Sequence, residues 1–313
     1  LLLALMALEV GPGDEVITTP FSFFATVSCI TRVGATPVFA DVEPGTYNID
    51  PEAVLAKITP KTKAIIPVHL FGQMARLEEF APRLREQGIG LVEDCAQAIG
   101  ATRIIDGKVR RAGAVGEIGC FSFFPTKNLG CFGDGGMVTV SSDELRTRVR
   151  SLRVHGSGKQ YFHDEIGLNS RLDELQAAIL RVRLPHLETW NEERRLVAER
   201  YRILFAEHDL DEWIMPPIEE KGNRHIFHQY VIRCRSRDQL KDHLAQRGVT
   251  ARVYYPLSLH LQPCFSFLGY SKGDMPVSET LTEEVLALPI FPELRPEEQE
   301  RVVKAMAEFY HGK

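Results

Sequence analysis

Short apolar runs alternate with longer amphipathic stretches along the first half of the chain. The runs have the length of buried strands, and the stretches between them carry helix start and stop signals, such as Asp50 before Pro51 and Gly88 after a periodic segment. Strands that alternate with helices form a mostly parallel sheet covered on both faces. We therefore predict an α/β domain with strands at residues 15–19, 36–41, 63–70, 89–93 and 137–140, and helices at 21–33, from 50 onward, and at 77–87.

The second half of the chain has a different pattern. Pro185 interrupts an amphipathic helix, and residues 187–205 form a charged helix that we interpret as a connection. Beyond it the pattern predicts a smaller α+β domain, with strands at 229–233 and 251–255 and helices at 239–247, 277–288 and 296–310. The predicted organisation is a large domain over residues 1–185, a connecting helix over 186–205 and a small domain over 206–313.

The helix that follows Asn169 carries an apolar stripe. Ser170 is its predicted cap, with Asp173 three positions on in capping-box spacing. Four apolar residues then fall on one face at helical spacing: Leu172, Leu175, Ile179 and Val182. Such a stripe is structural, and we expect it to pack against another domain or another subunit.

Length and charge narrow the class of protein. The 313 residues suffice for a sizeable core, and the formal net charge of -5 at pH 7 argues against a general nucleic-acid binder, which needs a clustered basic surface. Residues 1–8 are apolar, but a bilayer span takes about 20 residues. We interpret them as the second half of a buried helix and expect neither nucleic acid nor a membrane as a partner.

The cysteines and histidines do not indicate a metal site. The six cysteines contain no Cys-x-x-Cys pair and no regular spacing, so we expect free thiols and a cytoplasmic enzyme. His225 and His228 have the spacing of a metal-binding pair, but no cysteine or acidic ligand clusters with them in the sequence. We predict no metal ion.

Lys127 lies between an aromatic strand and a glycine-rich loop. Its stem can be buried in such a place while its amine is aimed at a pocket, and three aromatic residues in the four before Pro125 argue against an ordinary solvated loop. Burial disfavours the ammonium form, so the amine becomes nucleophilic near neutral pH and can form a Schiff base with an aldehyde such as pyridoxal phosphate. Lys127 is therefore a candidate catalytic residue.

The chemistry of such a lysine requires an acid that keeps the cofactor's ring nitrogen protonated. The strand at 89–93 ends in Glu93 and Asp94, and open α/β sheets bind ligands at the carboxyl ends of their strands. We favour Asp94 for this role. Strand alternation then points Glu93 the other way, toward a structural or solvated position.

Three separated motifs resemble the DegT/StrS family of sugar aminotransferases. They are Glu-Asp-x-Ala-Gln-Ala at the end of the strand at 89–93, Ser-Phe-x-Pro-x-Lys-Asn-Leu-Gly with Gly-Asp-Gly-Gly around Lys127, and the segment at 167–178. The similarity runs from about the first residue to the last. It implies the aspartate aminotransferase type of fold, known as the pyridoxal-phosphate transferase fold type I, and pyridoxal 5′-phosphate as the cofactor.

The resemblance also implies roles for individual residues. Gln97 would reach the ring hydroxyl of the cofactor, Ser122 would bind its phosphate and Phe23 would stack on its ring. Asn169 would reach the phosphate of the neighbouring subunit's cofactor, which implies a homodimer with shared sites. Without the resemblance, the same four side chains are explained as a helix-opening residue, a polar strand position, a core aromatic and part of a helix cap.

Substrate contacts are less well defined by the sequence. Residues 254–260 resemble the small-domain edge that lies near the sugar in the family, so Tyr254 and His260 are candidate substrate-binding residues. A half-buried aromatic strand end followed by a surface histidine explains them equally well. Both interpretations stay open at this point.

The reaction that the resemblance implies is ping-pong transamination. An amino donor, glutamate by resemblance, leaves its nitrogen on the cofactor, and a keto group on a nucleotide-linked sugar then takes it. The product would be an amino sugar for surface polysaccharide or secondary-metabolite glycosylation. Residues 46–50 and 167–178 are most similar to the branch that acts on 3-keto sugars, and 4-keto substrates remain an alternative.

Two other functions fit the same fold. A sugar dehydratase is expected to carry histidine in place of Lys127, so the intact lysine argues against it. A cofactor-binding regulator without catalysis is supported by the missing Ser-Gly-Thr phosphate loop, which the family carries just before the first helix; either the sequence is truncated or those residues are not recorded. An enzyme is favoured over such a regulator by the joint presence of four residues: Lys127, Asp94, Gln97 and Ser122.

Overall fold

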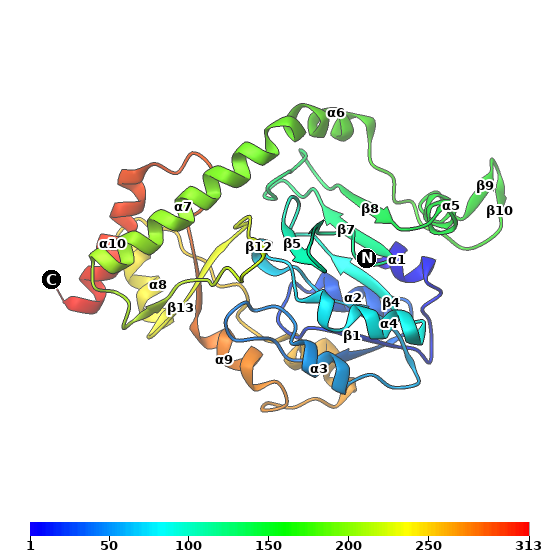
Figure 1. The fold of residues 1–313 in the computed structure, drawn as a ribbon, viewed down its shortest axis with the longest axis horizontal. Coiled ribbons are helices and arrows are strands. Elements are labelled where there is room, and N and C mark those ends of the chain that lie inside the picture. The colour runs from blue at the N-terminus through cyan, green and yellow to red at the C-terminus, as the bar shows by residue number, and fades with distance from the viewer. Residues whose placement is uncertain (313) are drawn as a thin grey trace.

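A six-stranded sheet forms the centre of the first half of the chain (Figure 1). In the computed structural model, which describes residues 1–312, the strand order is β2-β1-β3-β4-β7-β8. Neighbouring strands are parallel except β8, which runs antiparallel to β7. The predicted mostly parallel sheet is confirmed. Its strands are β1 (Glu15–Thr18), β2 (Thr36–Phe39), β3 (Thr62–Ile66), β4 (Gly90–Asp94), β7 (Ile118–Ser122) and β8 (Gly136–Val140).

Helices cover both faces of this sheet because successive strand residues point to opposite sides. Ile66 and Val92 face a core shared with α1, α2 and α5, whereas Ile65 and Leu91 face a core shared with α3 and α4. Asp50 caps α3 as expected, since its side chain accepts from the backbone N–H of Glu52. The helices are α1 (Leu2–Ala7), α2 (Ala25–Arg32), α3 (Pro51–Ala56), α4 (Ala81–Gln87) and α5 (Asp143–Leu152).

A long helix leads from this sheet to a second one (Figure 1). Helix α6 (Glu174–Arg183) is followed by a 3-10 turn, η3 (Leu184–His186), that contains Pro185, and by α7 (Leu187–Glu207). The predicted interruption at Pro185 is confirmed. The predicted cap at Ser170 is wrong, because α6 begins four residues later and its N-cap, Asp173, makes no side-chain capping bond.

The second sheet has three antiparallel strands in the order β11-β13-β14. They are β11 (Ile214–Met215), β13 (Tyr230–Cys234) and β14 (Val285–Leu288), and they pack against α7, α8 (Arg237–Gln246) and α10 (Pro296–His311). Tyr201 of α7 stacks on Tyr230 of β13 with ring centroids 5.0 Å apart. None of the helices within residues 1–312 combines the length and the apolar character needed to cross a bilayer.

Several predicted elements differ from the structure. The strand predicted at 63–70 ends at Ile66, and a 3-10 turn begins at Leu70. The predicted helix 277–288 is α9 (Pro276–Glu284) followed by strand β14, since the run Val-Leu-Ala-Leu is buried and pairs with β13. The predicted strand 251–255 makes only an isolated bridge between Arg252 and Ala287. The predicted helix 77–87 is a 3-10 turn, η2 (Leu77–Glu79), followed by α4, with Pro82 in the first turn of that helix.

Part of the second half of the chain returns to the large sheet. The 3-10 segments η4 (Leu259–Leu261) and η5 (Pro263–Leu268) pack on Val27 and Phe39. The carboxylate of Asp41 accepts hydrogen bonds from the backbone N–H groups of Val277 (2.9 Å) and Ser278 (3.0 Å) at the start of α9. The remaining short elements are η1 (Leu70–Gly72), β5 (Thr102–Ile105), β6 (Lys108–Arg111), β12 (Asn223–Arg224), and the hairpin β9 (Ser157–Lys159) with β10 (Phe162–His163).

Replacement of Ile65 tests the importance of the central sheet. Ile65 of β3 is fully buried, so Ile65→Ala should lower the free energy of unfolding by about 3 kcal/mol through lost apolar burial and a residual cavity. Ile104→Ala in β5 is the matched control, because that side chain is 53% exposed. Urea denaturation measures both, and equal losses in the two variants would contradict the assignment of the core.

Candidate active site

A pocket of about 760 Å³ opens at the carboxyl ends of β4 and β7. This is the place where parallel sheets in α/β proteins hold their ligands. Most of the residues predicted for the site meet there. The lining includes Phe23, Thr26, Asp94, Gln97, Ser122, Lys127, His228, Tyr254 and Tyr255.

Asp94 ends β4 with its carboxylate held at the pocket. The residue is 4% exposed. Its Oδ2 accepts a hydrogen bond from Thr26 Oγ1 of α2 at 2.9 Å, and its Oδ1 accepts from the backbone N–H of Ala96 at 3.1 Å. These contacts fix the orientation of the carboxylate, which is what a group that must hold a proton on a bound ring requires.

Glu93, the neighbouring residue, points to the opposite face, as strand alternation predicts. It is fully buried, and its carboxylate accepts hydrogen bonds from His69 Nε2 and from the backbone N–H groups of Gly113, Val115 and Gly116, all between 2.7 and 2.9 Å. Burial alone would raise the pKa of Glu93, but these donors outweigh it and lower the pKa below its ordinary value. Its role is structural.

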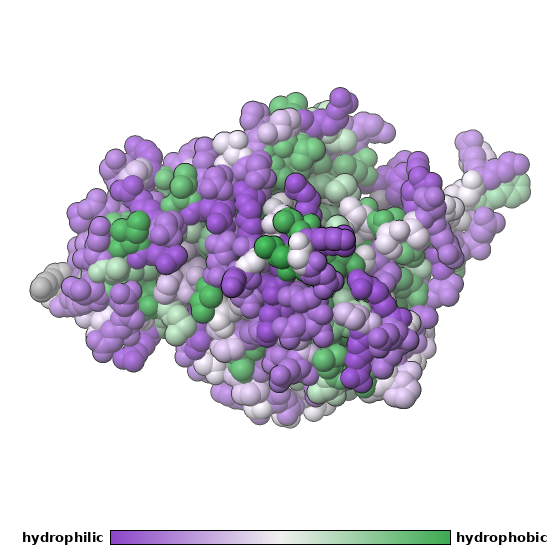
Figure 2. Space-filling model, viewed as in Figure 1, coloured by the Kyte–Doolittle hydropathy of each residue, from purple (hydrophilic) through white to green (hydrophobic). Residues whose placement is uncertain are grey.

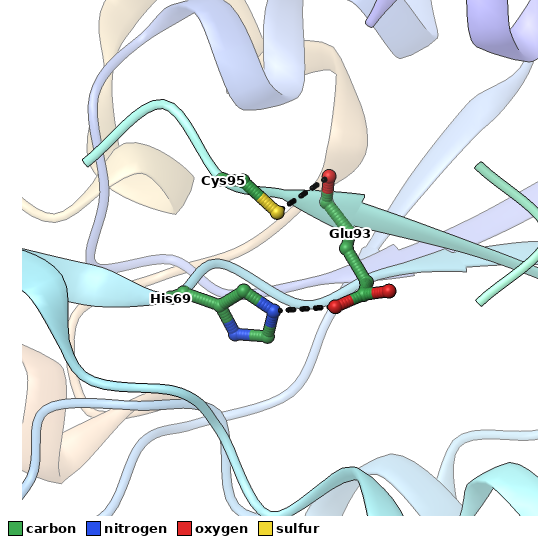
Figure 3. Close-up of side chains that lie close together, drawn as sticks. All are labelled: His69, Glu93 and Cys95. Carbon is green, nitrogen blue, oxygen red and sulfur yellow. Dashed lines mark hydrogen bonds and ion pairs between the residues drawn. The ribbon is translucent and has the colours of Figure 1, made fainter. Parts of the chain in front are cut away.

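His69, Glu93 and Cys95 lie close enough together to suggest metal ligands (Figure 3). Their atoms are already committed to hydrogen bonds, however. His69 Nδ1 accepts from the backbone N–H of Ala75 at 3.1 Å, so Nε2 carries the proton that it donates to Glu93. The Cys95 thiol donates to the backbone oxygen of Glu93 at 3.7 Å, and burial raises its pKa well above the ordinary value. We interpret the trio as an internal hydrogen-bond network.

Lys127 lies in the loop between β7 and β8 and lines the same pocket as Asp94. The loop turns tightly there, with the backbone N–H of Lys127 donating to the oxygen of Phe124 at 2.9 Å. Burial lowers the pKa of the Lys127 amine, and the negative charge of Asp94 offsets only part of this effect. The expected environment of a nucleophilic amine is therefore present.

Three further predicted residues line the pocket: Gln97, Ser122 and Phe23. Their side chains differ in how many hydrogen bonds hold them in place. Gln97 is held on both sides, because its Oε1 accepts from the backbone N–H of Phe71 at 2.7 Å and its Nε2 donates to the Tyr255 hydroxyl at 3.1 Å. Ser122 Oγ accepts from the backbone N–H of Phe124 at 3.3 Å, which leaves its own hydrogen free to donate. Phe23 is 61% exposed, so its ring is available as a wall for a flat ligand.

Two predicted residues lie outside this pocket. Asn169 is exposed in the loop before α6, where its Oδ1 accepts from Arg171 Nε at 3.2 Å. His260 is 1% exposed, and its ring contacts Ser258 Oγ at 2.8 Å and Glu279 Oε1 at 3.1 Å. The interpretation of His260 as a surface histidine is wrong, and its two partners leave no free ring nitrogen for a substrate.

Sequence reasoning missed three residues that the fold brings to the site. Thr26 holds Asp94, Tyr255 holds Gln97, and His228 lines the pocket near Lys127. Thr26 and Tyr255 lie close in sequence to Phe23 and Tyr254, which the sequence analysis predicts as site residues. His228 was considered only as half of a metal pair, and no local signal connects it with a lysine about a hundred residues away.

The comparison with known proteins covers nearly the whole chain. The model of the DegT/DnrJ/EryC1/StrS aminotransferase family matches residues 1–307. A pleiotropic regulatory protein of Geobacillus stearothermophilus is 52% identical over 98% of this chain and 82% of its own length. A UDP-N-acetyl-3-dehydro-α-D-glucosamine 3-aminotransferase of Acidithiobacillus ferrooxidans is 46% identical over 100% of this chain and 82% of its own. The crystal structure of DesV from S. venezuelae in complex with a ketimine intermediate has a TM-score of 0.93 at 40% identity, covering 98% of this chain and 81% of that one.

Replacement of Glu93 should destabilise the fold in a pH-dependent way. Glu93→Gln places an amide donor against backbone donors and should cost about 3 kcal/mol at pH 7. Because the pKa of Glu93 is lowered in the folded state, its contribution is present above the unfolded pKa of about 4.5 and is lost as pH falls through the folded value. The difference between wild type and variant, measured by urea denaturation, should therefore shrink below about pH 4.5.

The control for this experiment is Glu199→Gln. Glu199 pairs with Arg202 on the exposed side of α7, so its loss should change stability by less than about 0.5 kcal/mol at any pH. A Glu93→Gln variant whose deficit is the same at pH 4 and pH 7 would argue against a carboxylate that is charged in the folded protein.

Proposed function

Because the chain belongs to the DegT/DnrJ/EryC1/StrS aminotransferase family, we propose that it transfers an amino group from glutamate to carbon 3 of a uridine or thymidine diphosphate keto-sugar. The observation that carries the proposal is the placement of the Lys127 amine and the Asp94 carboxylate in one pocket at the end of the parallel sheet. The name of the Acidithiobacillus relative, which specifies carbon 3 and a UDP sugar, supports the choice of substrate.

The pocket residues fit pyridoxal phosphate, the cofactor of this family. The volume of about 760 Å³ can hold the cofactor together with a sugar, and the pocket contains an amine for the aldehyde and a carboxylate for the ring nitrogen. Gln97, Ser122 and Phe23 would contact the ring hydroxyl, the phosphate and the ring face. When bound, pyridoxal phosphate supplies an electron sink for the charge that develops on the carbon losing its proton.

Within this site each residue has a distinct task. The Lys127 amine, whose pKa is lowered by burial, takes the proton from the α carbon of the donor and returns a proton to the carbon that receives the nitrogen. The Asp94 carboxylate, oriented by Thr26, would hold the proton on the ring nitrogen of bound cofactor. Tyr254 lines the pocket and is the candidate contact to the sugar.

A shared dimeric site completes the proposal. Asn169 lies outside its own pocket. Two residues of the predicted stripe, Leu175 and Val182, are both 72% exposed, whereas Leu172 and Ile179 are half-buried. Figure 2 shows apolar side chains at the surface around α6. A second copy that covers α6 would bury this stripe and bring Asn169 of the partner subunit toward the phosphate.

The regulatory protein from Geobacillus stearothermophilus motivates a second candidate function. A regulator would use the pocket to bind the cofactor without turnover. It would have no need of a lysine with a lowered pKa or of an acid held by Thr26, so the geometry favours catalysis. A regulatory role and catalysis can also coexist in one protein.

The absorption of the purified protein tests the first half of the reaction. With added pyridoxal phosphate, the wild type should show the visible band of cofactor bonded to Lys127, and glutamate should bleach it. Lys127→Ala should lack the band and the activity with UDP- and dTDP-linked 3-keto sugars. Lys304→Ala, on the exposed side of α10 beside Glu300, is the lysine control and should behave as wild type. A wild-type band that glutamate leaves unchanged would exclude this donor.

Mixing two inactive variants tests the shared site. Lys127→Ala and Asn169→Ala homodimers should each be strongly impaired. After unfolding and joint refolding, half of the dimers are mixed, and each mixed dimer has one intact site, so activity should return to about a quarter of the wild-type value. Recovery no greater than the sum of the separate variants would show that Asn169 does not act across a dimer interface.

A further inference from the structure

A chain of buried hydrogen bonds connects the interior of the protein with His228 at the pocket. Asn191 of α7 donates through Nδ2 to the backbone oxygen of Ile99 at 3.2 Å. Its Oδ1 accepts from Asn128 Nδ2 at 2.7 Å, and Asn128 Oδ1 lies 3.0 Å from His228 Nδ1. All three side chains are buried, so water does not compete for these contacts.

The direction of the hydrogen bonds in this chain follows from two backbone carbonyl groups, those of Ile99 and Ile226. Asn128 Nδ2 also donates to the backbone oxygen of Ile226 at 3.3 Å. Because backbone oxygens only accept, turning over the amide of Asn128 or Asn191 would place oxygen against oxygen. Asn128 Oδ1 must therefore accept, and His228 Nδ1 must carry the hydrogen.

The ring of His228 is neutral in this environment. Burial lowers its pKa well below the ordinary value, and the positive charges of Lys127 and Arg194 lower it further. The Arg194 guanidinium lies close by, since its Nη1 donates to the backbone oxygen of His228 at 3.3 Å. A neutral imidazole with its hydrogen on Nδ1 has an unprotonated Nε2, which can only accept.

This Nε2 is available to the pocket. His228 lines the pocket together with Lys127 and Asp94, and within residues 1–312 its Nε2 has no hydrogen-bond partner. Asn128, which holds Nδ1, is the residue next to Lys127. The same set of contacts thus positions the histidine acceptor and the loop that carries the lysine.

We propose that His228 is a positioning residue for Lys127: when the pocket is loaded for reaction, the Lys127 amine donates a hydrogen bond to the open His228 Nε2 and is thereby oriented for proton transfer. The inference rests on the proposed function only in that Lys127 is the reacting amine. Donation of one hydrogen to a fixed acceptor restricts the directions open to the lone pair of the amine, which is what a base in a proton transfer needs. A purely structural role for His228 would require only the Nδ1 contact.

Two variants separate these roles. The amide of His228→Asn can reach the position of Nδ1 and keep the contact to Asn128, but it leaves no acceptor at the position of Nε2. The longer His228→Gln can present an acceptor to the pocket. His208→Asn, beyond the end of α7 and outside the pocket, is the control for the substitution itself.

We expect His228→Asn to lower the rate constant of the glutamate half-reaction about tenfold, with cofactor affinity and melting temperature close to those of the wild type. His228→Gln should recover most of the rate. In protein loaded with pyridoxamine phosphate, where the Lys127 amine is free, loss of an acceptor that stabilises the ammonium form should lower the pKa of Lys127 by about one unit. The pKa of Lys127 is measured by acetylating the folded protein at a series of pH values. Mass spectrometry of the peptide that contains Lys127 then gives the extent of acetylation at each pH.

The outcomes are distinguishable. If His228→Asn keeps the wild-type rate and Lys127 pKa, or if both variants lose only stability, His228 is structural and the inference is wrong. A wild type that glutamate does not bleach contradicts the proposed function instead. The nitrogen-15 spectrum of labelled histidine, with His228 assigned by the loss of its signal in His228→Gln, tests the tautomer independently of any activity. A hydrogen on Nε2, or on both nitrogens at pH 7, would overturn the inference.

Discussion

The alternation of side chains at the end of β4 is the constraint on which the site depends. Glu93 points into the protein and is held by His69 and by three backbone N–H groups, whereas Asp94 points into the pocket. A register slip of one residue would exchange the two carboxylates and leave a buried charge without its donors. The hydrogen bonds of Glu93 therefore determine where Asp94 lies, although Glu93 does not reach the pocket.

The loop that carries Lys127 is held by contacts on either side of the lysine. Phe123, before it, is buried, and its backbone groups pair with Gly135 and Cys131. Asn128, after it, is bound to Asn191 and to His228. The Lys127 side chain between these anchors lines the same pocket as Asp94, and burial lowers the pKa of its amine. Strong anchoring of a loop that must present a reactive amine is a physical requirement, because a small displacement of the amine would weaken proton transfer.

The pocket is assembled from both halves of the chain. The first half supplies the sheet ends with Asp94, Ser122 and Lys127, and the second half supplies His228 and the pair Tyr254 and Tyr255. The return of residues 259–284 to the large sheet holds this second set in place, through Asp41 at the start of α9 and through the cluster around Phe39. Asn169 does not line its own pocket, and the exposed residues Leu175 and Val182 of α6 follow it in the chain.

The sequence by itself determined the parallel α/β sheet, the opposed directions of Glu93 and Asp94, and the buried environment of Lys127. Each of these follows from a local pattern: strand periodicity, an acid after a strand, or a lysine within an aromatic run. Only the tertiary structure decided that residues 285–288 form a strand, that His260 is buried between Ser258 and Glu279, and that Asn128 and Asn191 hold His228 beside Lys127. Apart from Ser258, which is two residues from His260, the side-chain partners lie 19 to 100 residues away. A local pattern carries no information about which distant hydrogen-bond partner a polar side chain meets on folding.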